Sequence, residues 1–361
     1  MPVPTASKVQ LVPSSSPDLT FLHDDVPDFG ALSEIVPGLF WLRMPLPLAL
    51  DHVNLWVLDD GPGWCIVDTG LNADALKAIW KDLLGGPLAG KPVTQLIITH
   101  YHPDHAGLAG WLWSYCQPRP TLRMAKMEYL QSRALQLDDT HASLDVSHAF
   151  YAATGLSEEH LARYRERGNI YRGGVHEMPA PFEDLQEGDT LAIGGRQWEV
   201  LKGSGHSPDM AMLHCAADGV FLCGDQILPT ISPNVSIWPP EPFGDPLADF
   251  KTTLAALKSL PQDSLVLPGH GMPFRGLHAR IDTLLDHHEE RLDLAREACH
   301  DGVLATTVMD RLFERQLDEF QRLFAVGETL AHLNHLVSRD EITRREAADG
   351  RWIYSTRTNN A

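Results

Sequence analysis

The chain has 361 residues and a formal net charge of −19, with 29 Lys and Arg against 48 Asp and Glu. This length predicts roughly two domains, and the acidic balance disfavours non-specific binding to nucleic acid. We find no apolar run that is long enough to span a membrane, and no secretory signal pattern at the start. The cysteines are scattered, odd in number and without a C-x-x-C pair, which favours a reducing, cytoplasmic location: Cys65, Cys116, Cys215, Cys223 and Cys299.

The first part of the chain starts with a polar arm and continues as strands. Residues 1–30 are rich in Pro, Ser and Asp, which predicts a flexible arm. Apolar runs then predict several strands, and apolar residues at helical spacing predict two helices. The expected strands are 39–44, 53–58, 64–67, 93–98 and 121–125, and the expected helices are 73–84 and 108–115.

Residues 127–167 differ from the strands around them. This segment is rich in helix formers and charged residues, and Gly155 to Ser157 separates two expected helices. A helical insertion between strands either covers a site as a lid or packs as an ordinary addition. The sequence leaves both interpretations open.

The second part of the chain predicts two hairpins, at 190–202 and 210–223, followed by a helix at 247–260 and a strand at 265–267. Long helical patterns begin at Leu277. Strands interleaved with helices, with polar residues just past the strand ends, predict a layered α/β sandwich whose site lies along one edge.

The C-terminal segment has a different pattern. Amphipathic spacing predicts helices at 304–315 and 327–339. Two short strands, 342–345 and 352–354, flank a turn at Asp349-Gly350 and predict a β-hairpin. Helices followed by a two-stranded ribbon are typical of a small winged-helix domain.

Three histidines and one aspartate fall within six positions directly after the expected strand 93–98. They are His100, His102, Asp104 and His105. Neutral imidazole and carboxylate are the usual protein ligands of zinc. Alternation along a short extended segment can send His100 and His102 to one point, and Asp104 and His105 to a neighbouring one. The pattern therefore suits two metal ions side by side.

Three further residues qualify as ligands because each lies in a loop after a strand, next to glycine. They are His206 in Gly-Ser-Gly-His, Asp225 in Cys-Gly-Asp and His270 in Pro-Gly-His-Gly. A neighbouring glycine lets the backbone turn sharply and removes bulk near an ion.

These seven residues, in this order and context, resemble the metallo-β-lactamase fold superfamily, in its glyoxalase II-like hydrolase branch. The resemblance covers roughly residues 35–285 and implies a four-layer αββα sandwich, here with a catalytic domain at 31–285. The C-terminal part, 286–361, is similar to the winged-helix domain appended to one subgroup of these hydrolases.

The resemblance also implies the role of each residue. His100, His102 and His206 would hold one zinc ion, Asp104, His105 and His270 a second, and Asp225 would bridge the two. Asp68, at the end of the strand 64–67, would orient a ligand imidazole.

The expected cofactor is two Zn²⁺, with iron or manganese as alternatives. Two adjacent cations lower the pKa of a bridging water, so that hydroxide is available as the nucleophile near neutral pH. Asp104 and Asp225 are the candidate catalytic carboxylates.

Other residues near the motif are ambiguous. Tyr101 either faces the substrate or packs below the loop, and His52 either lines the cleft or has a structural role. His287 and His288 lie in a charged helical segment, which predicts a solvated surface.

The metal motif does not identify the bond that is cut, because this fold serves many reactions. The acidic charge and the helical insertion favour a hydrolase that acts on an acyl bond of a small molecule, such as a thioester, ester or lactone. The alternative is an endoribonuclease-like phosphodiesterase, favoured by five C-terminal arginines whose plain interpretation is a solvated surface paired with acids. A non-enzymatic metal-binding signalling protein and an iron persulfide oxygenase are minor alternatives. The C-terminal domain could also serve neither function and simply pack on the catalytic domain or on a partner subunit, which would make a homodimer. The arginines are Arg339, Arg344, Arg345, Arg351 and Arg357.

Overall fold

The computed structural model describes residues 19–22, 26–48, 50–138, 140–300, 302–314 and 316–357. Most of the expected N-terminal arm, residues 1–18 and 23–25, lies outside these ranges. Within the arm, Thr20–Phe21 forms strand β1, which pairs with β14 (Phe274–Arg275). Among the described residues, no helix combines the length and the apolar character needed to cross a membrane.

The first half of the sandwich is a seven-stranded sheet in the order β2-β3-β4-β5-β6-β7-β8. Its strands are antiparallel from β2 to β5 and parallel from β5 to β8, and the parallel ends carry polar loops at one edge. The strands are β2 (Leu32–Val36), β3 (Leu39–Pro45), β4 (His52–Asp59), β5 (Trp64–Val67), β6 (Val93–Ile98), β7 (Thr121–Met124) and β8 (Glu183–Asp184).

The second half is another seven-stranded sheet, in the order β1-β14-β13-β12-β11-β10-β9. Both expected hairpins are confirmed here, and β12 runs parallel to β13 because helix α8 connects them. The remaining strands are β9 (Thr190–Ile193), β10 (Arg196–Gly203), β11 (Met210–Cys215), β12 (Val220–Gly224) and β13 (Leu265–Pro268).

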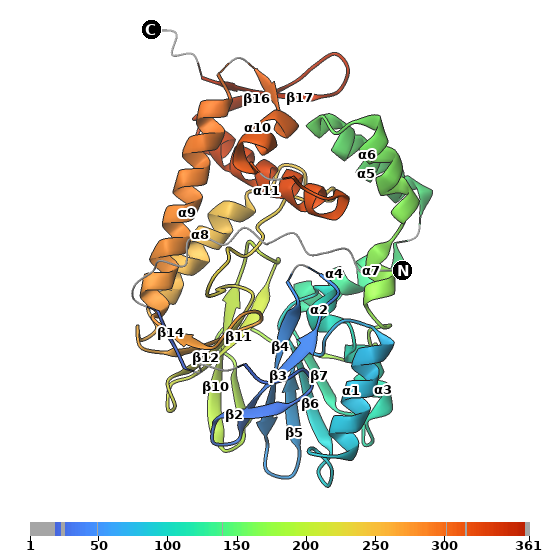
Figure 1. Cartoon of the computed structure of the whole chain (residues 1–361), viewed down its shortest axis with the longest axis vertical. Coiled ribbons are helices and arrows are strands. Elements are labelled where there is room, and N and C mark those ends of the chain that lie inside the picture. Colours follow the sequence, from blue (N-terminus) through green and yellow to red (C-terminus); the bar gives the residue numbers. More distant parts are fainter. Residues whose placement is uncertain are drawn as a thin grey trace.

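Helices cover the outer face of each sheet, so that the expected four-layer sandwich is confirmed (Figure 1). Helices α1 (Asp74–Gly85) and α3 (Ala109–Tyr115) pack on the first sheet, where Trp80 is fully buried. Helices α8 (Pro246–Leu257) and α9 (Leu277–Ala298) pack on the second. Between the sheets lies a third apolar layer that includes Trp41, Trp56 and Trp198. Burying such aromatic surface is the main favourable contribution to the sandwich.

The expected insertion 127–167 contains three helices where the sequence predicted two, and a short fourth helix follows it directly; the name insertion is used below for all four. The extra break separates α4 from α5, where the Thr140 side chain accepts a hydrogen bond from Ser143 N and caps the second helix. The helices are α4 (Lys126–Leu137), α5 (His141–Thr154), α6 (Glu158–Arg167) and α7 (Ile170–Gly174). In Figure 1, α5 and α6 lie beside the C-terminal helices, whereas α4 and α7 lie near the first sheet.

The C-terminal part comprises helices α10 (Ala305–Leu312) and α11 (Glu319–Ser338) and a three-stranded sheet in the order β15-β17-β16. Helix α11 begins well before the expected residue 327. The expected domain boundary after residue 285 falls inside α9, because this one helix packs on both the sandwich and α10 and α11. The strands are β15 (Val303–Leu304), β16 (Ile342–Glu346) and β17 (Trp352–Thr356).

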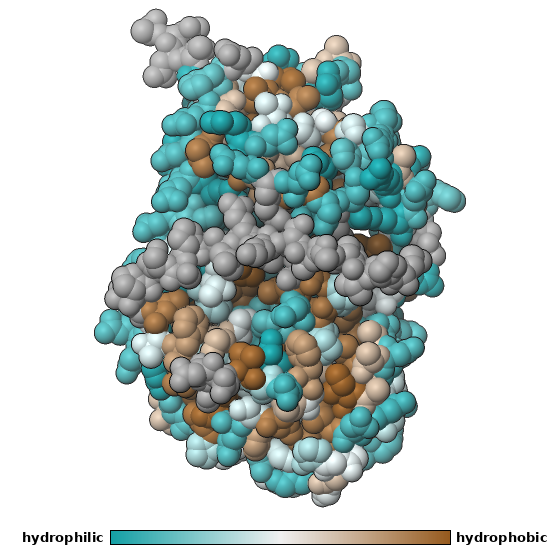
Figure 2. All heavy atoms as spheres, in the orientation of Figure 1, coloured by the Kyte–Doolittle hydropathy of each residue, from teal (hydrophilic) through white to brown (hydrophobic). Residues whose placement is uncertain are grey.

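The two parts of the molecule differ on the surface. Figure 2 shows hydrophilic side chains gathered around α9, α5 and α6, whereas apolar residues are more frequent over the two sheets. All five cysteines are buried, and each of them is free of a disulfide.

Candidate metal centre

The loop after β6 presents His100, His102, Asp104 and His105 at the edge of the sandwich. His100 follows the buried end of β6 and is itself fully buried. Pro103 starts the short helix α2 (Pro103–Ala106), a position that suits proline because its missing N–H has no helical partner. Asp104 and His105 therefore lie on a helical turn and face a different direction from His102.

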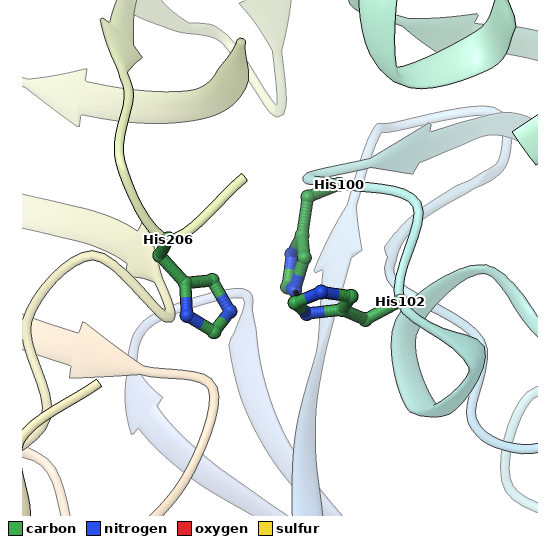
Figure 3. Close-up of side chains that lie close together, drawn as sticks. All are labelled: His100, His102 and His206. Atoms are coloured by element: carbon green, nitrogen blue, oxygen red, sulfur yellow. Dashed lines mark hydrogen bonds between the residues drawn. The ribbon is translucent and has the colours of Figure 1, made fainter. Parts of the chain in front are cut away.

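His100, His102 and His206 form one group, named here the three-histidine cluster (Figure 3). The Nε2 atom of His100 lies 2.9 Å from Nδ1 of His102. The His206 ring comes from the loop after β10, and its centroid lies 5.1 Å from that of His100 and 4.6 Å from that of His102. The three rings thus converge from two sheets.

Asp104, His105 and His270 form a second group, named here the acidic cluster. Asp104 Oδ2 lies 3.3 Å from His270 Nε2 and 3.8 Å from His105 Nε2. His270 comes from the loop after β13 of the second sheet. This cluster also draws on both halves of the sandwich.

Asp225 lies between the two clusters. Its Oδ2 atom is 3.2 Å from His270 Nε2, 3.4 Å from His105 Nε2 and 3.6 Å from His206 Nε2. Asp225 also forms a further group with His100 and His105 that could hold a metal ion. The structure therefore brings all seven predicted residues together.

The rings are oriented by contacts on their far sides. His206 Nδ1 donates to Asn234 O over 2.8 Å, and His270 Nδ1 donates to His52 O over 2.6 Å. His105 Nδ1 lies 2.8 Å from Asp68 Oδ2. Because Nδ1 donates in each such contact, Nε2 is the ring nitrogen that faces the centre of the site, where a bound cation would take its lone pair.

The residues present fit two divalent cations. In the described part of the chain, the buried Nε2 atoms of His105 and His206 and Oδ1 of Asp225 have no hydrogen-bond partner. Burial holds the pKa of His100 well below its usual value and that of His102 at about 3, so both imidazoles are neutral, as ligands must be. Nitrogen and carboxylate donors of this kind suit zinc and also iron or manganese.

The carboxylates give the acidic cluster a strongly negative potential. Burial alone would lower the pKa of His270, but Asp225 and then Asp104 raise it to about 10. The same charge would offset that of a bound cation. Only glycine fits at Gly269, because a Cβ atom at this position would lie 2.1 Å from Asp225 Oδ1.

Asp68 links the two clusters. From the sequence, we expected it only to orient one ligand imidazole. Its Oδ1 accepts from Thr99 N, and its Oδ2 accepts from Thr99 Oγ1, both over 2.8 Å. Thr99 Oγ1 in turn lies 2.9 Å from His100 Nδ1, while Asp68 Oδ2 holds His105. Asp68 has a φ of 63°, an uncommon backbone conformation for a non-glycine residue.

Asn54 is a buried residue of the site that the sequence reasoning missed. Its Nδ2 donates to Pro268 O over 2.9 Å and to Gly271 O over 2.8 Å, on either side of His270. Its Oδ1 accepts from Trp41 Nε1 over 2.8 Å. Asn54 could have been noticed in the sequence as an asparagine within an apolar strand, because a buried amide requires hydrogen-bond partners.

Two glutamates outside the sandwich were also missed. Glu328 on α11 lies 3.5 Å from Asn234 Nδ2, beside the carbonyl that holds His206, and 3.5 Å from Arg291. Glu128 on α4 is fully buried, and burial raises its pKa to about 7 despite hydrogen bonds from Ser207, Asp209 and Tyr101. Both lie in helical patterns, where a glutamate ordinarily indicates a solvated face.

Tyr101 and His52, the two candidates for contact with the substrate, instead pack against or support the loops of the site. The Tyr101 ring is buried and lies 6.1 Å from the ring of Tyr171, so it packs below the loop. His52 Nε2 accepts from Gly271 N over 2.9 Å, and its Nδ1 lies 2.6 Å from Asp51 Oδ1. Its ring therefore supports the His270 loop.

The interpretation of His287 and His288 as solvated is wrong for His288. That ring is fully buried, and its Nδ1 lies 3.2 Å from Nε2 of His332 on α11. The pattern along one helix does not reveal this contact, because the partner lies on a helix distant in the sequence.

Residues 48–270, more than half of the chain, match the family described as the metallo-beta-lactamase superfamily. The chain belongs to this superfamily and is a hydrolase. Residues 292–357 match the family described as metallo-beta-lactamase-like, C-terminal domain. The superfamily expected from the ligand pattern is thereby confirmed.

Similar proteins are known over almost the whole chain. A crystal structure of a beta-lactamase domain protein from Burkholderia ambifaria has a TM-score of 0.87 and 38% identity, with 94% of this chain and 98% of that chain covered. The probable metallo-hydrolase YqjP from Bacillus subtilis is 26% identical, with 84% of this chain and 93% of YqjP covered. The human acyl-coenzyme A thioesterase MBLAC2 is 24% identical, with 64% of this chain and 78% of MBLAC2 covered.

Proposed function

We propose that this protein is a dinuclear zinc-dependent hydrolase that cleaves an acyl bond of a small molecule, with thioesters as the first substrate class. The observation that carries this proposal is the pair of clusters with Asp225 between them. The similarity to the acyl-coenzyme A thioesterase MBLAC2 supports the choice of bond.

The three-histidine cluster would hold one ion, and the acidic cluster would hold the other. Two bound divalent ions supply a water of lowered pKa and polarise the carbonyl that is attacked. Asp225 has one oxygen close to histidines of both clusters, so it would fix the spacing of the two positions. Asp104 is the more exposed of the two carboxylates, so it is the candidate to accept a proton during turnover.

The surrounding residues hold the ligands rather than react. Asp68 keeps the proton on His105 Nδ1, and Asn234 O keeps the proton on His206 Nδ1. Each ring therefore offers Nε2 to the centre without a change of tautomer during turnover. Such preorganisation favours a centre that is ready for substrate when the ions are bound.

The nuclease alternative receives less support from the C-terminal arginines. Arg339 pairs with Glu341 at 2.6 Å, Arg351 with Asp349 at 2.7 Å and Arg357 with Asp340 at 3.2 Å. Arg344 stacks on Phe243, with its guanidinium carbon 4.0 Å from the ring centroid. Paired and stacked arginines contribute little to a phosphate-binding surface, so we do not propose this function.

A substrate panel tests the proposal. The zinc-loaded enzyme would be assayed with acyl-coenzyme A thioesters, simple lactones and single-stranded RNA, each with and without a chelator. The proposal predicts chelator-sensitive thioester or lactone hydrolysis and intact RNA. RNA cleavage without acyl hydrolysis would replace it with the nuclease, and activity that survives complete metal removal would exclude the metal mechanism.

A further inference from the structure

One carboxylate of the helical insertion contacts both loops that carry the three-histidine cluster. Glu128 Oε2 accepts from Tyr101 N over 2.9 Å, and Tyr101 stands between His100 and His102. Glu128 Oε1 accepts from Ser207 Oγ and from Asp209 N, each over 2.7 Å, directly after His206. Glu128 thus connects loops from the two different sheets.

A second residue of the insertion holds the same loop from the other side. The Tyr171 hydroxyl donates to Tyr101 O over 2.6 Å and lies 2.8 Å from Ser132 Oγ. Both the N–H and the C=O of Tyr101 are therefore fixed by α4 and α7. The backbone between two ligand histidines has little freedom to move relative to the insertion.

We propose that Glu128 is a positioning residue that sets the spacing between His206 and the pair His100 and His102. This inference rests on the proposed metal occupancy and not on the identity of the substrate. Changes in the insertion would then alter metal affinity through the hydrogen bonds of Glu128, in addition to any effect on substrate access to the site.

The chemistry of the contact requires a carboxylate. Three donors converge on Glu128, and a carboxylate has acceptor positions on both oxygens. A glutamine would turn its NH₂ toward at least one of these donors, so one hydrogen bond is lost without any change in size.

The test is a comparison of E128Q with wild type by metal binding. Zinc affinities of the metal-free proteins would be measured against a chromophoric chelator, and the cobalt-substituted forms compared by absorption spectroscopy. We expect one of the two metal equivalents to bind roughly 10- to 100-fold more weakly in E128Q, with an altered cobalt spectrum. The other equivalent should keep its affinity.

Gln136→Ala is the matched control. Gln136 lies on the same helix and makes hydrogen bonds to Val175 O, His176 O and Met178 N, but it touches neither ligand loop. It should leave both zinc affinities and the cobalt spectrum unchanged. The same loss in Gln136→Ala as in E128Q would show that general support of the insertion matters, and would overturn the proposal.

Ser207→Ala keeps the proposal falsifiable if E128Q does not fold. It removes one of the three hydrogen bonds to Glu128, and we expect about a threefold to tenfold loss for the same metal equivalent. If the wild-type protein binds two zinc equivalents, and folded E128Q and Ser207→Ala bind them with unchanged affinity, this inference is overturned and the proposed function is not. A wild-type protein that binds no metal would overturn the proposed function as well.

Discussion

The two halves of the metal centre are supported by different parts of the molecule. The acidic cluster is held within the sandwich, by Asp68 through His105 and by Asn54 around His270. The three-histidine cluster draws much of its support from outside it, through Glu128 of the insertion and Glu328 of α11. His100 is the exception, since Thr99 and Asp68 hold it.

The contrast suggests a way in which one fold can serve many reactions. In the proposed dinuclear site, the sandwich alone would fix one metal position, whereas additions to it would adjust the other. Segments that differ between relatives would then change the spacing of the centre without changing a ligand.

Removing Asp225 should affect both halves at once. In Asp225→Ala the carboxylate between the clusters is lost, and we expect kcat to fall roughly 10³-fold, or about 4 kcal/mol of transition-state stabilisation. Steady-state kinetics on the zinc-loaded protein measure this. Asp218→Ala, on a hairpin turn where Asp218 pairs with Arg196, is the control and should be near wild type. A kcat within twofold of wild type would contradict the bridging role.

Asp68→Asn should weaken both metal positions, because Asp68 contacts Thr99 beside His100 and also holds His105. An amide cannot accept from all of these donors, so we expect each zinc affinity to fall by up to about 100-fold. Competition with a chelator measures both affinities. Asp60→Asn, at the opposite end of β5, should leave them intact. Loss at only one position would show that Asp68 does not link the clusters.

Asn54→Ala should act on the acidic cluster and on stability. It removes the amide that donates to the carbonyls of Pro268 and Gly271 and accepts from Trp41 Nε1, so the free energy of unfolding should fall by about 2–3 kcal/mol. Chemical denaturation of the metal-free protein measures this, and zinc titration should show one weakened equivalent. The control is Asn334→Ala, a buried asparagine remote from the site that should destabilise without changing zinc affinity.

Acid should loosen the contact between α9 and α11 through His332. Burial lowers the pKa of this residue to about 3, whereas the unfolded chain titrates near the usual value. Between these values only the unfolded state binds the proton, so the stabilisation is complete above a pH of roughly 6.5 and is lost as the pH falls toward about 3. We expect a loss of about 2 kcal/mol from this residue between pH 7 and pH 5.

The measurement for His332 is denaturation of the metal-free protein at both pH values. His332→Gln should lose about 2 kcal/mol less than wild type over this interval. His300→Gln, which removes an exposed histidine, is the control. An equal pH dependence in wild type and His332→Gln would show that this histidine does not titrate on unfolding.

Glu328→Gln should have the smallest effect. The contact of Glu328 with Asn234 is 3.5 Å long, and it acts on His206 only through the backbone carbonyl of Asn234. We therefore expect the zinc affinity of the three-histidine cluster to weaken by about twofold to fivefold. The affinity of the acidic cluster should not change. A weakening confined to that cluster would reverse the comparison between the two halves.

The ligand set could be predicted from sequence because its signal is local. His100 to His105 lie within six positions, and His206, Asp225 and His270 each follow a strand and adjoin a glycine. Strands and the hairpins at 190–202 and 210–223 were predictable because alternation and turn residues are also local. Fold and superfamily followed from these features.

The supporting residues could not be predicted, because they act through contacts between distant segments. Glu128 meets Ser207 across 79 positions, and His288 meets His332 across 44. On a helix such residues have the same pattern as solvated ones, and only tertiary packing decides between the two. The cap at Thr140, which divides the insertion, was overlooked for a simpler reason: it follows a polar helix with a weak pattern.

Stepwise zinc titration of the metal-free protein shows whether two metal positions lie side by side. We expect two equivalents per wild-type chain, with one equivalent selectively weakened in E128Q and the other in Asn54→Ala. A wild-type protein that binds one equivalent or none would exclude the paired positions, and variants in which both equivalents always weaken together would exclude their separate support.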